Sequence, residues 1–300
     1  MGNINYNTLR PFSKLKKIGL PRLVMPDPAL NGNIEGRTFQ YQPTDAPAYW
    51  RNGGNLIDYD KDELLYTVNE YGFRGNDIVQ TDSMLMTAGC SHTYGIGVRE
   101  NEVWGSQLAE QLGMYHINIG VGGIGIDTVA LLIRQFFNEG IIPDTLAVLW
   151  PVSNRKLFIS DERKSLDDDI HNFLVHPTEN KPSIYQFTPG NTPPELEDLK
   201  SSVKGYLFQT NQQNLFDFWI QREFVIAMCE SHNVKLLEGF TEKETVEYIE
   251  TNCNKNISRS KFFGANDNKD PFDWARDAMH FGTKAHTNIA NKFASTHKSH

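Results

Sequence analysis

The 300-residue sequence contains few cysteines, no excess of basic charge and no long apolar run. Its three cysteines, Cys90, Cys229 and Cys253, are an odd number and form no CxxC pair, which argues against a disulfide framework and a zinc knuckle. With 29 Lys and Arg against 37 Asp and Glu, the net charge is −8, so no basic field attracts nucleic acid. We therefore expect a reducing compartment and no nucleic-acid partner.

The apolar content excludes two further classes of protein. The first residues, "MGNINYNTLRPF", lack the apolar core of a signal peptide, and no window approaches the length of a membrane span. Hydrophobic residues make up 39% and charged residues 22%, which is ordinary globular usage and excludes wholesale disorder or a fibrous repeat. We expect a soluble, cytoplasmic protein without a membrane span.

The order of apolar segments predicts the class of fold. Residues 1–82 are rich in Pro, Gly, Asn and Tyr and predict an irregular arm that packs on a core. Strands are predicted at "MLMTAG", "YHINI", "TLAVLW" and "VKLLEGF", and helices at "VWGSQLAEQL", "DTVALLIRQFFNE", "LFDFWIQREFVIAMCESH", "EKETVEYIE" and "KAHTNIANKFA". This alternation predicts a mostly parallel sheet, covered by helices on both faces, with ligands at the carboxyl ends of its strands. Residues 83–300 would form this domain, with an insertion at about 155–233.

Two glycine-rich stretches follow predicted strands. In "GCSHTYG", Ser91 lies between Gly89 and Gly95, where it is well placed as a nucleophile, although it could merely cap a helix. The second stretch, "NIGVGGIG", formally matches a dinucleotide fingerprint, but the next strand, "TLAVLW", is not followed by the acidic residue that would hold a ribose. Its glycines could instead present a backbone amide to an oxyanion or form a packing turn.

Two polar segments complete the set of candidate residues. Asn154 in "LWPVSN" follows the third strand and could donate hydrogen bonds to an alkoxide, or satisfy a turn. Asp277 and His280 in "RDAMHFG" are spaced so that the carboxylate can hold one ring nitrogen while the other faces a serine. A metal site with Asp277, His280 and His286 is the alternative, although no HExxH motif or cysteine set completes it.

The succession "GCSHTYG", "NIGVGG", "PVSN" and "DAMHFGTKAH" resembles the blocks of the SGNH hydrolase superfamily, the GDSL-type esterases, and "VNEYGFRG" resembles a segment upstream of the serine block. The resemblance covers roughly residues 66–154 and 270–295. It implies a three-layer α/β/α sandwich, flavodoxin-like, around a parallel sheet of about five strands, here with an amino-terminal arm and a helical insertion. It implies a triad of Ser91, His280 and Asp277. The oxyanion hole would consist of the Ser91 amide, the Gly123 amide and the Asn154 side chain.

The implied activity is that of a serine esterase acting on a small acyl ester, such as an acetyl ester, without a cofactor or metal. Two residues depart from the family pattern: Cys90 stands where the signature has aspartate, and Arg155 follows Asn154 where an acidic residue is common. Aromatic and amide residues in "SIYQFTPGN" and "NQQNLFDFW" suit a glycan substrate, or could simply pack the insertion. An O-acyltransferase with the same triad and a non-catalytic binding or assembly module remain the alternatives.

Overall fold

The computed structural model describes residues 37–39, 64–69, 73–79, 81–160, 183–187, 210–252, 260–262, 273–277 and 280–298. Most of the predicted arm over residues 1–82 and much of the predicted insertion over 155–233 lie outside the described residues.

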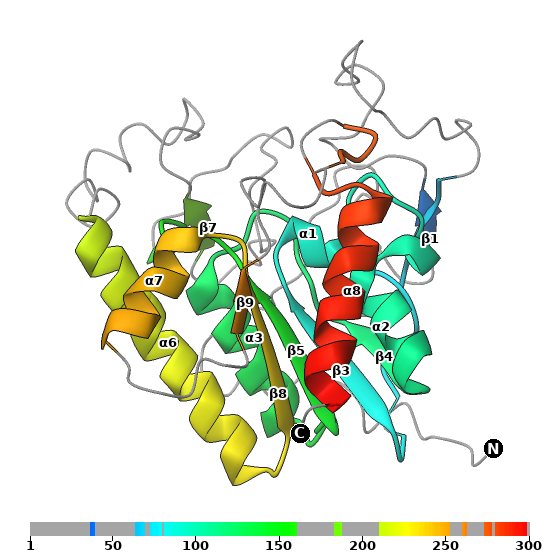
Figure 1. The fold of residues 1–300 in the computed structure, drawn as a ribbon, viewed down its shortest axis with the longest axis horizontal. Coiled ribbons are helices and arrows are strands. Elements are labelled where there is room, and N and C mark those ends of the chain that lie inside the picture. Colours follow the sequence, from blue (N-terminus) through cyan, green and yellow to red (C-terminus); the bar gives the residue numbers. More distant parts are fainter. Residues whose placement is uncertain are drawn as a thin grey trace.

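The elements of the described ranges alternate between strands and helices over most of the chain (Figure 1). In chain order they are β1 (Arg37–Phe39), β2 (Tyr66–Val68), β3 (Met84–Gly89), α1 (Ser91–Tyr94), the 3-10 turn η6 (Glu100–Glu102), α2 (Trp104–Leu112), β4 (Tyr115–Asn118), α3 (Ile126–Asn138), β5 (Thr145–Trp150), β6 (Lys156–Ser160), β7 (Ser183–Phe187), α6 (Asn211–Ser231), β8 (Lys235–Phe240), α7 (Lys243–Asn252), β9 (Ser260–Phe262) and α8 (Thr283–Lys298).

Five of these strands form one sheet in the order β4-β3-β5-β8-β9, and every neighbouring pair is parallel. The chain runs from β3 to β4 on one side and then crosses to β5 on the other side of β3. The strand order therefore reverses between β3 and β5, and in such sheets ligands bind in the crevice at the carboxyl ends of those two strands. The predicted parallel α/β fold is confirmed.

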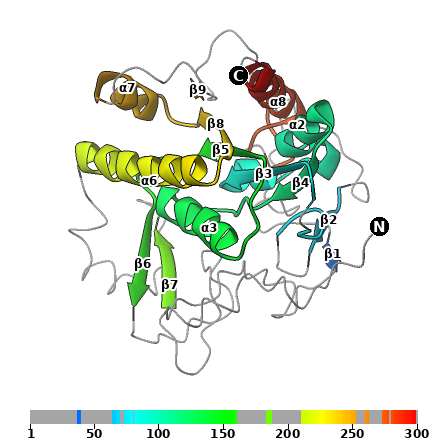
Figure 2. The same ribbon diagram turned by 90° about the horizontal axis from the view of Figure 1, so that it is seen from below.

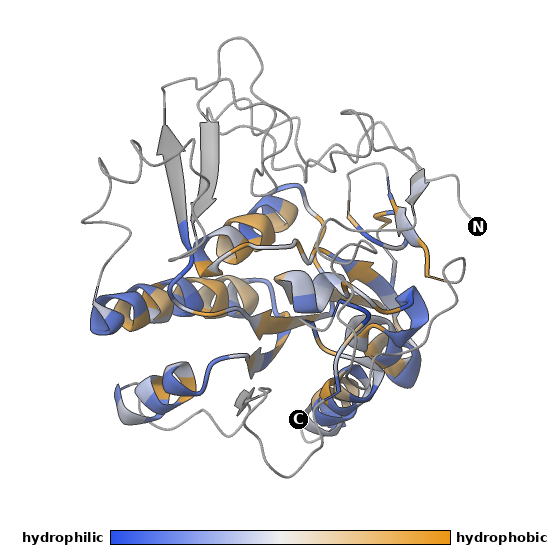
Figure 3. Cartoon of the chain, turned by 90° about the horizontal axis from the view of Figure 1, so that it is seen from above, coloured by the Kyte–Doolittle hydropathy of each residue, from blue (hydrophilic) through white to orange (hydrophobic). Residues whose placement is uncertain are grey.

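Helices cover both faces of this sheet, as Figure 2 shows, with α3 and α6 on one face and α2 and α8 on the other. The strands alternate to match: Met86 of β3 and Val148 of β5 pack with α3 and α6, whereas Leu85 and Leu149 pack with α2 and α8. Each large apolar side chain buried in this way contributes roughly 1.5–3 kcal/mol, so the two layers fix the sheet between them. Figure 3 shows apolar residues along the strands and helices, and α6 also carries exposed apolar side chains, Phe216, Ile220 and Phe224.

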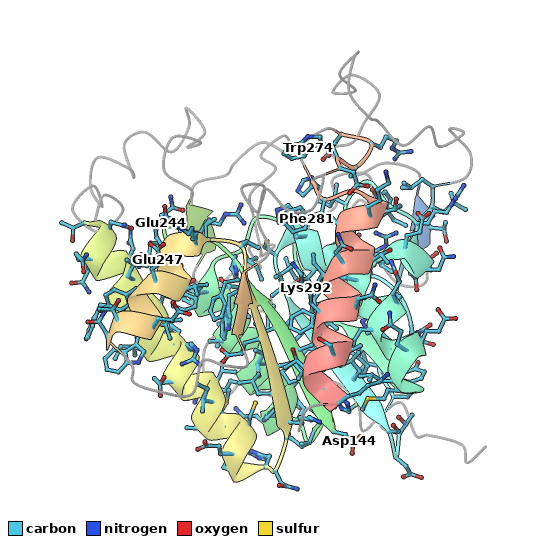
Figure 4. The ribbon with its side chains drawn as sticks, viewed as in Figure 1. Asp144, Glu244, Glu247, Trp274, Phe281 and Lys292 are labelled. Carbon is cyan, nitrogen blue, oxygen red and sulfur yellow. The ribbon has the colours of Figure 1, made fainter. Side chains whose placement is uncertain are left out.

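The amino ends of β3 and β5 are also joined by a side chain. Asp144, at the edge of the molecule in Figure 4, accepts a hydrogen bond from the Met84 amide at 2.8 Å. The carboxylate thereby fixes the relative position of the two strands at the end opposite their carboxyl termini.

Several elements differ from the predicted ones. The helix predicted to begin at Leu215 begins four residues earlier, because the Thr210 side chain caps it by accepting a hydrogen bond from the Gln213 amide at 3.2 Å. The antiparallel pair β6 and β7 and the short strand β9 were not predicted. The sequence of these segments shows no clear alternation of apolar and polar residues. No helix within the described ranges is both long enough and apolar enough to cross a membrane.

We predict that Gly89→Ala destabilises the protein much more than Gly140→Ala. Both glycines have a positive φ, +153° and +80°, which costs a side-chain-bearing residue about 1–2 kcal/mol. A Cβ at position 89 would also lie 2.2 Å from Thr93 Oγ1 and 2.5 Å from the Leu149 carbonyl oxygen, whereas a Cβ at position 140 meets nothing within 4 Å. Overpacking at position 89 should increase the loss of unfolding free energy by about 1–3 kcal/mol. Urea unfolding of both variants measures this difference. Equal losses in the two variants would show that β3 and β5 separate easily.

Candidate active site

Ser91 is the first residue of the short helix α1, directly after β3. Cys90 occupies the N-cap position, and no side chain caps this helix, so the helix-capping interpretation of Ser91 is wrong. Ser91 is only 5% exposed, and no hydrogen bond of its hydroxyl occurs among the described residues. Within the described ranges, the Ser91 hydroxyl therefore neither caps α1 nor bonds another group.

The carbonyl end of α1 is held by Arg74, which belongs to the upstream segment "VNEYGFRG". The buried guanidinium donates to the carbonyl oxygens of Tyr94 (3.2 Å), Gly95 and Val98 (2.8 Å). It also lies 4.5 Å from the centre of the Tyr66 ring, which contributes a cation–π interaction. Sequence reasoning missed this residue. The signal available was an arginine in the segment that resembles the family's upstream block.

The glycine-rich loop after β4 packs on α1. Asn118 donates through Nδ2 to the Thr93 carbonyl oxygen at 3.0 Å and accepts through Oδ1 from the Gly120 amide at 2.8 Å. A Cβ on Gly120 would lie 2.6 Å from the Tyr94 nitrogen, so this glycine is required for a contact inside the protein. This favours the packing interpretation of the first fingerprint glycine over dinucleotide binding. Gly123 lies in the turn of the same loop, with φ +76°.

Asn154 follows β5 between two anchored neighbours. The Ser153 amide donates to Glu242 Oε2 at 3.0 Å, and Arg155 Nη1 donates to the Ile124 carbonyl oxygen at 3.3 Å. The second bond joins the Asn154 segment to the loop that contains Gly123. Asn154 Oδ1 is buried and has no hydrogen-bond partner in the described part of the chain.

Asp277 and His280 are hydrogen-bonded to each other in the loop before α8. Asp277 is completely buried and accepts two hydrogen bonds from His280, from the backbone amide at 3.0 Å and from Nδ1 at 2.5 Å. The loop is tied to α8 by Asp273, whose carboxylate accepts the amides of Lys284 (2.9 Å) and Ala285 (2.8 Å). This arrangement places the ring proton on Nδ1 and leaves Nε2 as the acceptor nitrogen.

The loop with His280 and the segment with Ser91 meet through His92. The His92 ring lies 5.2 Å from the His280 ring and stacks on Phe281 at 3.8 Å between centroids. Figure 4 places Phe281 at the upper end of α8, opposite Asp144, which lies at the other end of the sheet. The structure thus brings the neighbour of Ser91 against His280. A direct Ser91–His280 hydrogen bond is not present among the described residues.

Two histidines beside His280 are held neutral. Burial lowers the pKa of His92 well below its usual value, and the neighbouring His280 and Arg155 lower it further. Burial, Arg74 and His280 lower the pKa of His286 to about 3.

His286 has a structural partner, because its Nδ1 accepts a hydrogen bond from the Trp104 amide at 3.1 Å. In the part of the chain that is described, no group of three or more His, Cys, Asp or Glu side chains is arranged to hold a metal ion. The hydrogen bond to Trp104 occupies one of the ring nitrogens that the alternative metal site would have used.

Of the aromatic residues suggested for a glycan, Phe218 packs inside the protein, whereas Phe216 is 43% exposed. Phe218 of α6 is completely buried and packs edge-to-face on Trp150 at 5.5 Å. Leu215 is buried as well. The packing interpretation of "NQQNLFDFW" therefore holds for these two residues.

Comparisons with known proteins return structures but no family. No protein-family model matches the sequence, and no curated protein matches it. A carbohydrate esterase family 2 enzyme from Corynascus thermopiles (Myceliophthora fergusii) is similar with a TM-score of 0.44 at 11% identity, over 78% of this chain and 70% of that chain. The acetyl xylan esterase Est2A from Butyrivibrio proteoclasticus gives 0.37 at 14% identity, over 76% and 66%. A carbohydrate acetylesterase family member from Sinorhizobium meliloti gives 0.39 at 10% identity, over 72% and 98%.

We predict that the free energy of unfolding falls as the pH drops below 6.5, and that His286 causes part of this loss. Its pKa is about 3 in the folded protein against 6.5 ordinarily, so between these values the unfolded chain binds a proton that the folded chain does not. One such group contributes a slope of about 1.4 kcal/mol per pH unit.

His286→Asn keeps an acceptor for the Trp104 amide and removes the titration, so it should reduce the slope by about one proton. Urea unfolding at several pH values between about 6 and 4 measures this slope. The exposed His232→Asn serves as the control. An unchanged slope in His286→Asn would mean that His286 takes up a proton without unfolding.

Proposed function

We propose that the protein is a serine ester hydrolase that uses Ser91 as nucleophile, His280 as general base and Asp277 as the residue that orients the base. The observation that carries this proposal is the buried Asp277–His280 pair, in which the carboxylate accepts from both the amide and Nδ1 of the same histidine. A histidine fixed in this way has one tautomer and one orientation, which is what proton transfer from a serine requires.

The position of the pair supports the same roles. His280 packs against His92, the residue after Ser91, at the carboxyl edge of the sheet where the strand order reverses. The hydroxyl of Ser91 has no competing partner in the described residues. Ligands of parallel α/β sheets bind at this edge, so an ester there would lie beside both groups.

The reaction proceeds through an acyl-enzyme. His280 Nε2 takes the proton of Ser91 Oγ as Oγ attacks the ester carbonyl, and the resulting tetrahedral oxyanion collapses, breaking the bond to the alkoxy group. The alcohol leaves with the proton from His280. Water then attacks the acyl-serine, gives a proton to His280, and the acid is released as that proton returns to Ser91.

The negative charge of the tetrahedral oxygen requires donors that are fixed before the reaction. We assign this role to the amides of Ser91 and Gly123 and to Asn154 Nδ2. The bonds of Arg155 to Ile124 and of Ser153 to Glu242 hold two of these segments in position. All of these groups belong to the chain itself, so the proposed chemistry uses no cofactor. The acyl group we propose is small, such as acetyl, and a carbohydrate ester is one suitable substrate.

The first test is covalent labelling. A fluorophosphonate should form one adduct, on Ser91, and this adduct should be absent in Ser91→Ala, as should hydrolysis of 4-nitrophenyl acetate. Asp277→Asn should reduce kcat by about 10⁴-fold, because the base loses its tautomer. Ser231→Ala, at an exposed serine of α6, should label as the parent does. An adduct that persists in Ser91→Ala, or full hydrolysis by that variant, would exclude Ser91 as the nucleophile.

The second test concerns the oxyanion donor. Asn154→Ala should reduce kcat by about 10²–10³-fold while KM and the unfolding midpoint change little, because the donor acts on the tetrahedral oxygen. The control is Asn138→Ala at an exposed position of α3. A rise in KM at constant kcat would place Asn154 in ground-state binding instead.

A further inference from the structure

Arg155 lies at the proposed oxyanion hole but is not required by the reaction. It follows Asn154 directly, and its Nη1 donates to the Ile124 carbonyl oxygen at 3.3 Å. Its backbone carbonyl lies 2.4 Å from the place a Cβ on Gly125 would take. The arginine is therefore in contact with the loop that carries Gly123, at the edge where an ester would bind.

The charge of Arg155 is not neutralised by a carboxylate among the described residues. Two other cations of the described residues are paired with carboxylates: Arg222 Nη2 lies 2.7 Å from Glu238, and Lys156 Nζ lies 2.7 Å from Asp217. Arg155 has only the carbonyl of Ile124, and its Nε is buried without a hydrogen-bond partner in the described part of the chain. A partly buried guanidinium in this state loses solvation without gaining an anion, which favours an anion supplied by a ligand.

The nearby carboxylates have other partners. Glu242 accepts the Ser153 amide and, at 2.6 Å, the Thr245 hydroxyl. Asp277 is held by His280. After burial and His280, the positive charge of Arg155 also lowers the pKa of His92. The His92 ring packs against His280. The field of Arg155 thus reaches the wall of the proposed catalytic site, in a chain whose net charge is −8.

We propose that Arg155 recognises an oxyanion, a carboxylate or a phosphate, on the molecule that carries the ester. The planar guanidinium binds such groups through several N–H donors, and in the described part of the chain the Ile124 carbonyl oxygen accepts from Nη1 alone, so donors remain for an anion. This inference rests on the proposed function and specifies its substrate as an anionic ester.

The test compares matched substrates. The wild-type protein and Arg155→Gln are assayed on 4-acetoxybenzoate, on 4-acetoxyphenyl phosphate and on the neutral isostere 4-acetoxybenzamide. In Arg155→Gln, the ratio of kcat/KM for an anionic ester to that for the amide should fall roughly 10- to 100-fold, mainly through KM, as for loss of a charged hydrogen bond. The anionic ester whose ratio falls more shows whether Arg155 prefers a carboxylate or a phosphate.

Two control variants and a salt series separate the effect of the Arg155 charge on binding from an effect on folding. Arg155→Lys should restore part of the preference, whereas Arg134→Gln, the same charge change at an exposed position of α3, should leave the ratio unchanged. Added salt should reduce the preference in the wild type more than in Arg155→Gln.

Equal losses of kcat/KM on anionic and neutral esters would overturn the proposal. Arg155 would then act only by holding the glycine loop in position. An unchanged ratio would overturn it as well. If the wild type takes the fluorophosphonate on Ser91 and hydrolyses the neutral ester without any preference for anions, only the role of Arg155 fails. Absence of both labelling and hydrolysis would instead contradict the proposed function.

Discussion

The close approach of β3 to β5 is the constraint on which the candidate site depends. The two strands run parallel with Gly89 opposite Leu149, and the Leu149 carbonyl oxygen occupies the space that a side chain at position 89 would need. Because the strands end together, the chain that follows each of them emerges at the same edge of the sheet. Ser91, which follows β3, and Asn154, which follows β5, therefore both lie at this edge of the sheet.

Polar side chains from distant parts of the chain then fix each segment at that edge. Arg74 binds the carbonyl end of α1, Asn118 joins α1 to the glycine loop, and Glu242 holds the segment before Asn154. Asp273 does the same for the loop with His280, through two amides at the start of α8. Each bond satisfies a backbone group that would otherwise be desolvated without a partner. The same bonds that make these turns stable hold them in one geometry, which electrostatic catalysis requires.

The strands and helices of the sheet domain could be predicted because their apolar periodicity is strong. The segment "MLMTAG" became β3 with the predicted bounds, and "TLAVLW" became β5. The Asp277–His280 contact could also be predicted, since a spacing of three residues is local. The role of Arg74 could not, because its acceptors are carbonyl oxygens twenty or more residues away, and no side-chain pattern encodes them. The contact of His92 with His280 depends on the packing of α1 against the last loop, which is equally invisible to periodicity.

Charge at the edge of the sheet differs from the charge of the whole chain. Arg74 and Arg155 act on the histidines there, and burial together with these cations lowers the pKa values of His92 and His286. His280 is hydrogen-bonded to a buried carboxylate, that of Asp277. If a proton passes from Ser91 to His280, the new imidazolium forms beside Asp277 and next to two neutral rings, which add no full positive charge to oppose it. Burial is the main cause of the low pKa of His92, and Arg155, which lowers it further, is also the group that we propose for an anionic substrate.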